Sequence, residues 1–408
     1  MTADGRLLFV ASGLRSLAFG FLSVILGPYL ALAGLSTPTI GAIFTAALAG
    51  GALMTVLVTA VADRAGRRAM LMGSAGLMAL GGVGFALTDR PGWLFAAAIV
   101  GVISPSGKEV GPFSSIEQAI LPQTVPDRRR TDMFAAYNLV SSLCGALGAL
   151  VVALPGALGL AGLAGYRSLV WGYVATALVL GAVFARLSPA AEARRESAPA
   201  GARLFALSRS RGVAVKLSAL FALDSFAGGF VVQGMVSYWL HLRYGMPDAG
   251  LASVFFAANL LSALSFLAAG PLARRIGLLN TMVFTHLPSN VLLLLVPLMP
   301  TMPLALGVLL ARYLLSQLDV PTRQSYVMAV VEPGERAAAA GLTSVARNAA
   351  AAVAPAFAGA TLAVPALGIP FLVAGGLKIV YDLLILAAFR RVLPPEERAS
   401  AAVSASRR

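Results

Sequence analysis

Residues 7–33 read LLFVASGLRSLAFGFLSVILGPYLALA, an apolar run whose single charged side chain is Arg15. About 20 helical residues cross the roughly 30 Å hydrocarbon core of a bilayer, so this run is long enough to span a membrane. A signal peptide also begins with a basic residue and an apolar run, but this run continues past Leu30, carries a charge and lacks a convincing cleavage site. It therefore predicts a permanent transmembrane helix.

Similar apolar runs fill the rest of the chain. Hydrophobic residues make up 58% of the 408 residues and charged residues 12%, whereas about a quarter of a soluble domain is charged. The runs are too long and too continuous for the strands of a membrane barrel, so we expect an all-α membrane protein. Twelve helices are predicted, at 7–33, 38–61, 69–88, 93–121, 132–155, 167–187, 213–241, 250–270, 280–298, 304–330, 337–362 and 370–391.

The basic residues set the predicted orientation, because Lys and Arg are retained on the cytoplasmic side during insertion. If the N-terminus is cytoplasmic, the loops on the opposite side hold only three basic residues, Arg90, Arg167 and Arg243. The formal charge of +14 therefore reflects topology and does not indicate nucleic acid as a partner. We expect a multi-pass protein of a bacterial-type plasma (inner) membrane, embedded in the lipid bilayer, with both termini cytoplasmic.

An internal repeat divides the predicted helices into two sets of six. Shifted by 209 residues, RSLAFGF at 15–21 lies on DSFAGGF at 224–230, and shifted by 211, the loop at 63–68 lies on 274–279. Matches in chain order at similar offsets indicate a duplication. The sequence therefore predicts the following parts: an N-terminal half at 1–187, a cytoplasmic linker at 188–212 and a C-terminal half at 213–408.

The loop ADRAGRR at 62–68 resembles the signature loop of the major facilitator superfamily (MFS), which joins helices two and three. The resemblance implies the MFS fold of twelve transmembrane helices in two pseudo-symmetric six-helix halves. This chain departs from the pattern at Thr59 and, in the second copy of the loop, at Arg274. An acidic residue at a helix end can pair in one conformation and release in another, so the loop is either a gate or a basic topology anchor. The candidate gating residues are Asp63, Arg64, Gly66, Arg67 and Arg68.

Ionisable side chains inside the predicted helices are candidates for a functional site. Near mid-bilayer each costs about 2.5 to 3.5 kcal/mol unless it has a partner or a wet cavity. Arg15 lies near the middle of the first helix, and its repeat equivalent Asp224 lies at a similar depth in the seventh. In the family that the loop resembles, these two helices face each other across the central cavity. We therefore expect Arg15 to pair with Asp224, either as a switch or as a permanent structural pair.

The fourth predicted helix is interrupted by SPSGKEVGP at 104–112. Such a break frees backbone groups, which is tolerated where a helix borders a cavity. Lys108 and Glu109 are adjacent, so they point to different sides and at least one should reach another helix or the cavity. Asp319–Arg323 and Lys378–Asp382 are each four residues apart, which favours local ion pairs. The remaining candidates for a substrate or proton pathway are Arg312, Asp319, Arg323 and Arg347.

Other kinds of chemistry find no support in the sequence. A single cysteine, Cys144, excludes an internal disulfide, and His241 and His286 are too far apart for a zinc motif. Both histidines are interpreted as neutral packing or interface residues. We identify no nucleophile and base pair, so an enzyme is not predicted. The chain is expected to be a monomer without cofactor or metal.

The resemblance implies a secondary active transporter that moves a small-molecule substrate by alternating access. Protons are the expected coupling ion, carried by Asp224 or Glu109. The signature loop, without a recognisable sugar or peptide motif, resembles that of the drug/proton exporter branch and favours efflux. Two alternatives stay open: a facilitator or uptake carrier for an organic or phosphorylated anion, and a non-transporting membrane receptor of the same fold.

Overall fold

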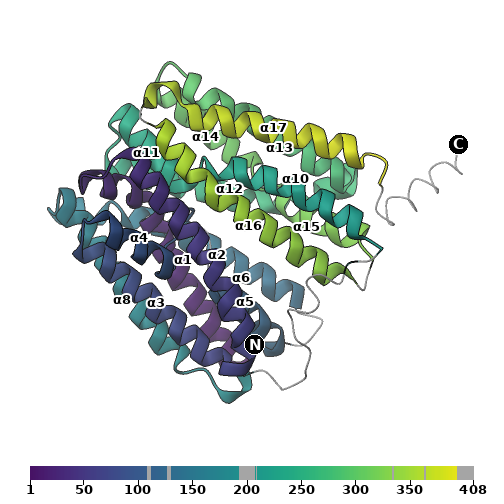
Figure 1. Ribbon diagram of the computed structural model, residues 1–408, viewed down its shortest axis with the longest axis horizontal. Coiled ribbons are helices and arrows are strands. Elements are labelled where there is room, and N and C mark those ends of the chain that lie inside the picture. The colour runs from purple at the N-terminus through teal and green to yellow at the C-terminus, as the bar shows by residue number, and fades with distance from the viewer. Residues whose placement is uncertain are drawn as a thin grey trace, which may run out of the picture. The chain divides into compact units, whose positions relative to one another are not determined.

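The computed structural model describes residues 1–107, 112–125, 130–192, 207, 209–332, 335–362 and 364–392. Within these residues every regular element is a helix (Figure 1). Nine helices in this part of the chain are long and apolar enough to cross a membrane, by length and composition. The prediction of an all-α membrane protein is confirmed.

The first six predicted spans correspond to α1 through α8. The first helix begins at a capped end, because Thr2 Oγ1 accepts a hydrogen bond from the Gly5 N–H at 3.3 Å. The bounds are α1 Ala3–Leu32, α2 Thr37–Ala65, α3 Arg67–Leu87, α4 Pro91–Val100, α5 Pro112–Ile120, η1 Leu121–Thr124, α6 Arg130–Val151, α7 Leu154–Ala157, α8 Gly162–Phe184 and η3 Pro189–Ala191.

The last six predicted spans correspond to α10 through α17. Gly245, with a left-handed φ of 60°, ends one of these helices in a conformation that favours glycine. The bounds are α10 Arg211–Gly229, α11 Gln233–Tyr244, α12 Asp248–Ile276, α13 Leu278–Leu295, η4 Val296–Leu298, α14 Met302–Leu315, α15 Asp319–Val330, α16 Arg336–Thr361, η6 Pro365–Leu367 and α17 Ile369–Phe389.

Three of the predicted spans are broken in two. The sequence predicts the break between α4 and α5, where Val102 and Gly107 have positive φ values of 52° and 68°. The predicted spans run through the breaks between α10 and α11 and between α14 and α15, although each break has a signal. Gly228 and Gly229 directly precede the first break, and Pro321, which cannot donate to the carbonyl of Gln317, follows the second. At the repeat offset of 211, positions 316–318 fall on 105–107. The fourth and tenth spans are therefore interrupted at equivalent places.

Two glycines show that the repeat extends to backbone conformation. Gly66 separates α2 from α3 with a φ of 96°, and Gly277 separates α12 from α13 with a φ of 87°. Side chains of L-residues rarely adopt such values, so glycine is the residue that fits both turns. The 211-residue offset superimposes these two glycines. The same turn thus follows the second span of each set of six.

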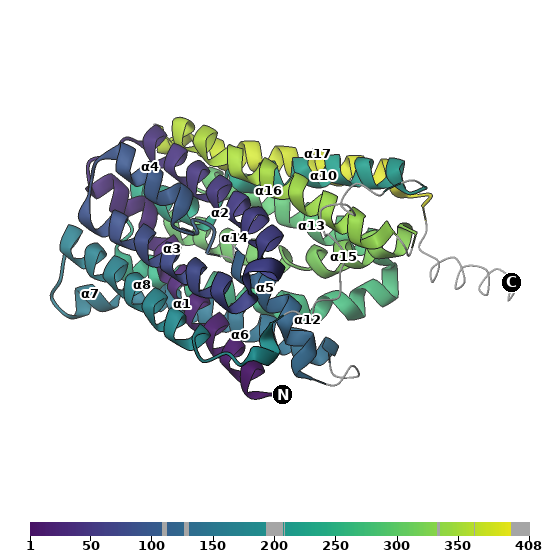
Figure 2. The ribbon, with the colours of Figure 1, turned by 60° about the horizontal axis from the view of Figure 1, so that its bottom comes forward.

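The described chain forms two compact units. Unit 1 comprises Met1–Ala198, Phe230–Leu260 and Ala352–Ile369. Within it, α1 lies against α6, α8 and α11 (Figure 1), and α3 lies against α8 (Figure 2). A Cβ at Gly20 would meet the backbone of Gly145. Small residues of this kind let membrane helices approach closely.

Unit 2 comprises Pro199–Gly229, Leu261–Ala351 and Pro370–Arg408. Within it, α13 lies against α14 and α15 (Figure 2). An apolar core joins side chains from five helices, among them Phe221 of α10, Val283 of α13, Tyr326 of α15, Ala339 of α16 and Ile385 of α17, all of them buried. The charged residues described below stand beside this core.

Candidate functional site

The first buried charge cluster lies in unit 1 and consists of Arg15, Phe113, Glu117 and Tyr137; it is called the Arg15 cluster. Arg15 Nη1 and Nη2 donate to the two carboxylate oxygens of Glu117, at 2.8 Å each. Both side chains are 0% exposed. The Tyr137 hydroxyl also donates to Glu117, and the Arg15 guanidinium lies 4.7 Å from the centroid of the Phe113 ring. This bidentate geometry fixes the two side chains relative to each other.

The second buried charge cluster lies in unit 2 and is called the Asp224 cluster. Asp224 accepts hydrogen bonds from Lys378 Nζ at 2.5 Å and from Arg323 Nη1 at 3.1 Å. The same Arg323 nitrogen lies 3.1 Å from Asp319 Oδ2. The cluster draws its members from α10, α13, α15 and α17, and all of them are buried: Asp224, His286, Asp319, Arg323, Lys378 and Asp382.

His286 lies between two carboxylates of the Asp224 cluster. Its Nδ1 is 2.8 Å from Asp382 Oδ1, and its Nε2 is 3.7 Å from Asp224 Oδ1. Asn290 Nδ2 donates to the other oxygen of Asp382 at 2.8 Å. Each ring nitrogen of His286 therefore faces a carboxylate, and Asn290 Nδ2 also lies 3.0 Å from its Nδ1.

Two further arginines border the Asp224 cluster. Arg347 lies beside Ser225, the residue after Asp224, and the backbone carbonyl of Arg312 accepts a hydrogen bond from Ser289 Oγ of α13 at 3.3 Å. Arg347 Nε donates to Ser225 Oγ at 3.1 Å, whereas the Arg312 guanidinium lies 5.1 Å from the centroid of the Tyr313 ring. Both arginine side chains are partly exposed. They form an accessible, cationic border beside a buried cluster.

The internal repeat relates the two clusters, with their charges exchanged. Arg15 and Asp224 are 209 residues apart, and their partners Glu117 and Arg323 are 206 residues apart. The partners lie on α5 and α15, the half-helices that follow the equivalent breaks. Each set of six spans therefore contains an ion pair between its first and fourth spans. Arginine pairs with glutamate in one, and aspartate with arginine in the other.

The predicted pairing of Arg15 with Asp224 is wrong, because each charge is already neutralised by other residues. Glu117 neutralises Arg15, while Lys378 and Arg323 neutralise Asp224. Taking a charge out of water is costly unless an opposite charge is held in good geometry. The repeat correctly marks both positions as buried charges, but it does not identify their partners.

The two predicted local ion pairs have different outcomes. Asp319 and Arg323 are paired along α15, as expected from their spacing. Lys378 and Asp382 do not pair with each other, because each is bound by a residue from another helix of unit 2. Lys378 binds Asp224, and Asp382 contacts His286. A four-residue spacing places two side chains on one face, but partners on neighbouring helices compete for them.

The predicted site residues do not include Glu117, Tyr137, His286 or Asn290, which contact the buried charges. Tyr137 and Asn290 are uncharged and leave no trace in a pattern of charges. His286, predicted to be a neutral packing or interface residue, contacts two carboxylates. Glu117 had a usable signal, because it is an ionisable residue inside the predicted fourth helix and the 209-residue offset brings it within three positions of Arg323.

Part of the predicted site lies outside the described residues. This applies to Lys108 and Glu109 in the break of the fourth span. It also applies to the side chains of Asp63 and Arg64 in the predicted gating loop. Their roles stay predictions.

The described part of the gating loop binds a carboxylate that the sequence analysis did not single out. The N–H groups of Arg67 and Arg68 donate to Glu192 at 2.6 and 3.2 Å. These are the first N–H groups of α3, which have no partner inside the helix and carry the positive end of its dipole. Gly66 turns the chain so that this helix end is open to Glu192. The linker thus caps the third span.

Unit 1 joins segments from both predicted halves. The Gly234 N–H at the start of α11 donates to the carbonyl of Pro105, at 2.9 Å. The break in the fourth span is therefore hydrogen-bonded to the first turn of α11, just after the break in the seventh. Helices α2 and α16 meet at two glycines, since a Cβ at Gly41 would lie 2.8 Å from the Cα of Gly359. This junction leaves no room for a side chain.

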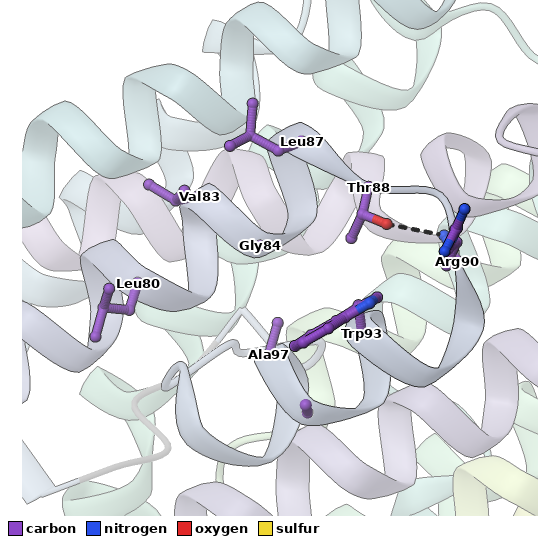
Figure 3. A pocket seen from close by; sticks show the side chains of 9 residues that line it. Leu80, Val83, Gly84, Leu87, Thr88, Arg90, Trp93 and Ala97 are labelled. Carbon is purple, nitrogen blue, oxygen red and sulfur yellow. Dashed lines mark hydrogen bonds between the residues drawn. The ribbon is translucent and has the colours of Figure 1, made fainter.

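A shallow groove of about 480 Å³ lies between α3 and α4 (Figure 3). Its polar edge is a turn in which the Arg90 N–H donates to Thr88 Oγ1 at 3.2 Å. Trp93 is 67% exposed, as expected for a surface that faces lipid. No residue of either charge cluster lines the groove, so we place the candidate site at the clusters. The lining residues are Leu80, Val83, Gly84, Leu87, Thr88, Arg90, Trp93, Ala96 and Ala97.

Comparison with known proteins gives consistent matches. Residues 8–316 match the family model described as Major Facilitator Superfamily. The chain is 28% identical to an uncharacterized membrane protein of Saccharomyces cerevisiae, over 95% of this chain and 94% of that protein. Its fold is similar to that of a mutant of the nucleoside transporter NupG, with a TM-score of 0.78 and 16% identity, covering 95% of this chain and 100% of the other. It is also similar to that of a D-xylose-proton symporter, with a TM-score of 0.74 and 16% identity, over 95% and 98% of the two chains.

Proposed function

Since this chain belongs to the major facilitator superfamily, we propose that it is a secondary transporter that moves a small solute by alternating access and couples this movement to protons. The proposal places the coupling at the Asp224 cluster. It also places the protein in a bacterial-type plasma membrane, as a monomer with cytoplasmic termini. The observation that carries the proposal is the buried, titratable series from Asp382 through His286 to Asp224.

Protonation of Asp224 would unbalance its cluster. As a carboxylate, Asp224 holds the ammonium of Lys378 and the guanidinium of Arg323. A proton on Asp224 removes the charge that both cations bind. Removing one partner of a buried ion pair is strongly unfavourable, about 3 to 5 kcal/mol. The unit must then move or take up another charge, which links proton binding to conformation.

His286 supports a route for this proton. An imidazole can hold a proton on either ring nitrogen, and both ring nitrogens of His286 face a carboxylate. A proton accepted at Asp382 can pass through the ring and reach Asp224 after a small movement, since the second gap is 3.7 Å. Glu109, the other predicted proton carrier, lies outside the described residues.

The Arg15 cluster is proposed to have a structural role. Its one positive and one negative charge neutralise each other, the hydrogen bonds between them are bidentate, and the ion pair is 0% exposed. Such a pair binds no further charge without being broken. The sequence predicts a switch made of Arg15 and Asp224. We therefore propose that Asp224 acts in the switch and that Arg15 has a structural role.

The direction of transport depends on the sign of the coupling. Export driven by an inward proton gradient requires solute and proton to exchange, so they must compete for the site. Uptake requires them to bind together. The resemblance of the loop at 62–68 to exporters supports efflux, and efflux is the direction proposed from the sequence.

Membrane vesicles test the proposal directly. Right-side-out and inside-out vesicles from a host expressing the full chain are incubated with a mixture of small metabolites under an imposed proton gradient. The accumulated solutes are measured by mass spectrometry, with and without an uncoupler. The comparison includes Asp224→Asn and a matched control, Lys216→Gln, which changes an exposed residue of the same helix.

The proposal expects at least one solute to accumulate only with the gradient present, in one vesicle orientation. Asp224→Asn should abolish this accumulation and Lys216→Gln should preserve it. Accumulation to the same level with the uncoupler would identify a facilitator instead. Vesicles with correctly inserted protein that take up no more of any solute than empty vesicles would contradict transport itself.

A further inference from the structure

The charges around the Asp224 cluster do not balance. Its buried part holds two cations against three carboxylates, and the two partly exposed arginines at its border bring the count to four cations against three carboxylates. In a membrane protein, charges at this depth are normally paired with one another or with a ligand. The excess cation therefore requires a partner that is absent from this set of side chains. The cations are Arg312, Arg323, Arg347 and Lys378, and the carboxylates are Asp224, Asp319 and Asp382.

Arg323 has one buried hydrogen-bond donor without a partner. Its side chain is 5% exposed, and its Nη1 makes the hydrogen bond to Asp224 and the ion pair with Asp319. Tyr381 is a further side-chain partner, and the centroid of the Phe221 ring lies 5.5 Å from the guanidinium. Its Nε is buried without a hydrogen-bond partner within the described residues. A buried N–H that lacks a partner carries a desolvation penalty of about 1 to 3 kcal/mol.

Arg312 and Arg347, whose side chains are partly exposed, also carry guanidinium donors without a partner among the described residues. The Nε of Arg312 is buried and also lacks a hydrogen-bond partner among the described residues. Arg347 uses Nε for Ser225, and its two Nη groups have no hydrogen-bond partner in that part of the chain. Guanidinium groups present paired donors whose geometry matches a carboxylate or a phosphate. Three of them around one buried aspartate are suited to an anion.

From these observations we infer that the transported solute is an organic anion, whose carboxylate or phosphate group binds Arg323 and Arg347 at the Asp224 cluster. This inference rests on the proposed transport function. The excess cation and the spare guanidinium donors lie on the same side chains. A cationic solute would add to the excess charge, and a neutral solute would leave it uncompensated.

The charge of the solute also sets the sign of proton coupling. A proton on Asp224 or His286 makes the cluster more positive, so it strengthens the binding of an anion. By linkage, the anion strengthens the binding of the proton. The two therefore travel together, and an inward proton gradient drives uptake. The inferred direction of transport is therefore uptake, in place of the efflux proposed from the loop at 62–68.

Thermal unfolding of the purified full chain tests this inference with a matched set of probes. The probes are 4-phenylbutyrate, phenyl phosphate, 4-phenylbutanamide and 4-phenylbutylamine, each in excess at pH 6 and pH 8. At least one of the two anions should raise the unfolding midpoint by about 2 °C or more. The rise should be larger at pH 6, while the amide and the amine should have no effect.

Two variants locate the effect. Arg347→Gln, at a partly exposed side chain with one hydrogen bond, should fold and lose the response to the anion. Arg211→Gln, an exposed residue at the start of α10, should keep it. Equal or greater stabilisation by the amine or the amide, no response to either anion, or an unchanged response in Arg347→Gln would overturn the inference. None of these results affects the vesicle test, so a transporter of another solute class stays distinguishable from a protein that does not transport.

Discussion

Arg15 and Glu117 form a closed pair: two guanidinium nitrogens donate to two carboxylate oxygens at 2.8 Å, and neither side chain is exposed. Because the pair is buried, removing one partner leaves a charge with no water to solvate it. Glu117→Gln should destabilise the protein by about 3 to 5 kcal/mol. Chemical unfolding in detergent measures this loss.

The double variant Arg15→Met with Glu117→Met checks that the cost comes from the unpaired charge. It removes both charges and should recover most of the stability, since apolar replacements of buried ion pairs are often neutral. Tyr137→Phe is a milder control that removes the hydrogen bond donated to Glu117 and a long one accepted from Arg15, and it should cost about 1 kcal/mol. A double variant as unstable as Glu117→Gln would mean that the pair itself, rather than charge neutralisation, supports the fold.

His286→Gln should separate transport from its proton drive. Glutamine keeps a polar group in the cluster but cannot pass a proton between Asp382 and Asp224. Gradient-driven accumulation should fall by about 5-fold to 150-fold, while solute exchange without a gradient continues. His241→Gln is the matched control. Among the described residues, the hydrogen-bond partner of His241 is the backbone carbonyl of Met246, 3.2 Å from its Nδ1. Equal losses in the two variants would remove His286 from the proton route.

The close contact between Gly41 and Gly359 in unit 1 should limit how far α2 and α16 can separate. Gly41→Val places a side chain against the backbone of Gly359 and should hold α2 and α16 apart. A reporter is provided by Ser237→Cys, since Ser237 is buried and donates to the Val24 carbonyl at 2.6 Å. In a background without Cys144, the thiol at position 237 should react faster with a polar maleimide when Gly41 is changed.

Gly73→Val is the control for this junction, because a Cβ at Gly73 would meet no atom within 4 Å. It should leave the labelling rate unchanged. If Gly41→Val has the same labelling rate as Gly73→Val, the junction does not keep this end closed.

The cap on α3 should depend on the charge of Glu192. Glu192→Gln weakens two charge-assisted hydrogen bonds to the amides of Arg67 and Arg68, by about 1 kcal/mol in total. Hydrogen exchange of these two amides should become faster. Glu335→Gln is a matched control, because Glu335 accepts hydrogen bonds from backbone N–H groups just before α10, at Arg209 and Ser210. Its effect should be confined to those amides.

Hydropathy and charge placement predicted most of the fold. Apolar runs located the spans, and the repeat placed Gly66 and Gly277 in equivalent turns. The break in the fourth span was predictable because glycine and proline disrupt helices. The break before Asp319 also had a signal that the predicted span ran through, since Pro321 lacks an N–H and cannot donate to the carbonyl of Gln317.

The candidate site was predictable as a set of positions but not as a set of contacts. The cost of burying a charge singles out Arg15, Asp224 and Arg323 from the sequence alone. Which opposite charge binds each of them depends on which helices are neighbours, and hydropathy does not contain that information. For the same reason, the contacts of His286 with two carboxylates could not be predicted from its position in the sequence.

The central claim is that Asp224 carries the coupling proton, and proton flux measured in proteoliposomes tests it most directly. Purified protein is reconstituted with a pH dye inside, and the solute identified in the vesicle screen is added outside. Wild type should change the internal pH when the solute is added, and Asp224→Asn should exchange solute without any pH change. A solute-driven pH change of wild-type size in Asp224→Asn, with an unchanged pH dependence of transport, would contradict the claim.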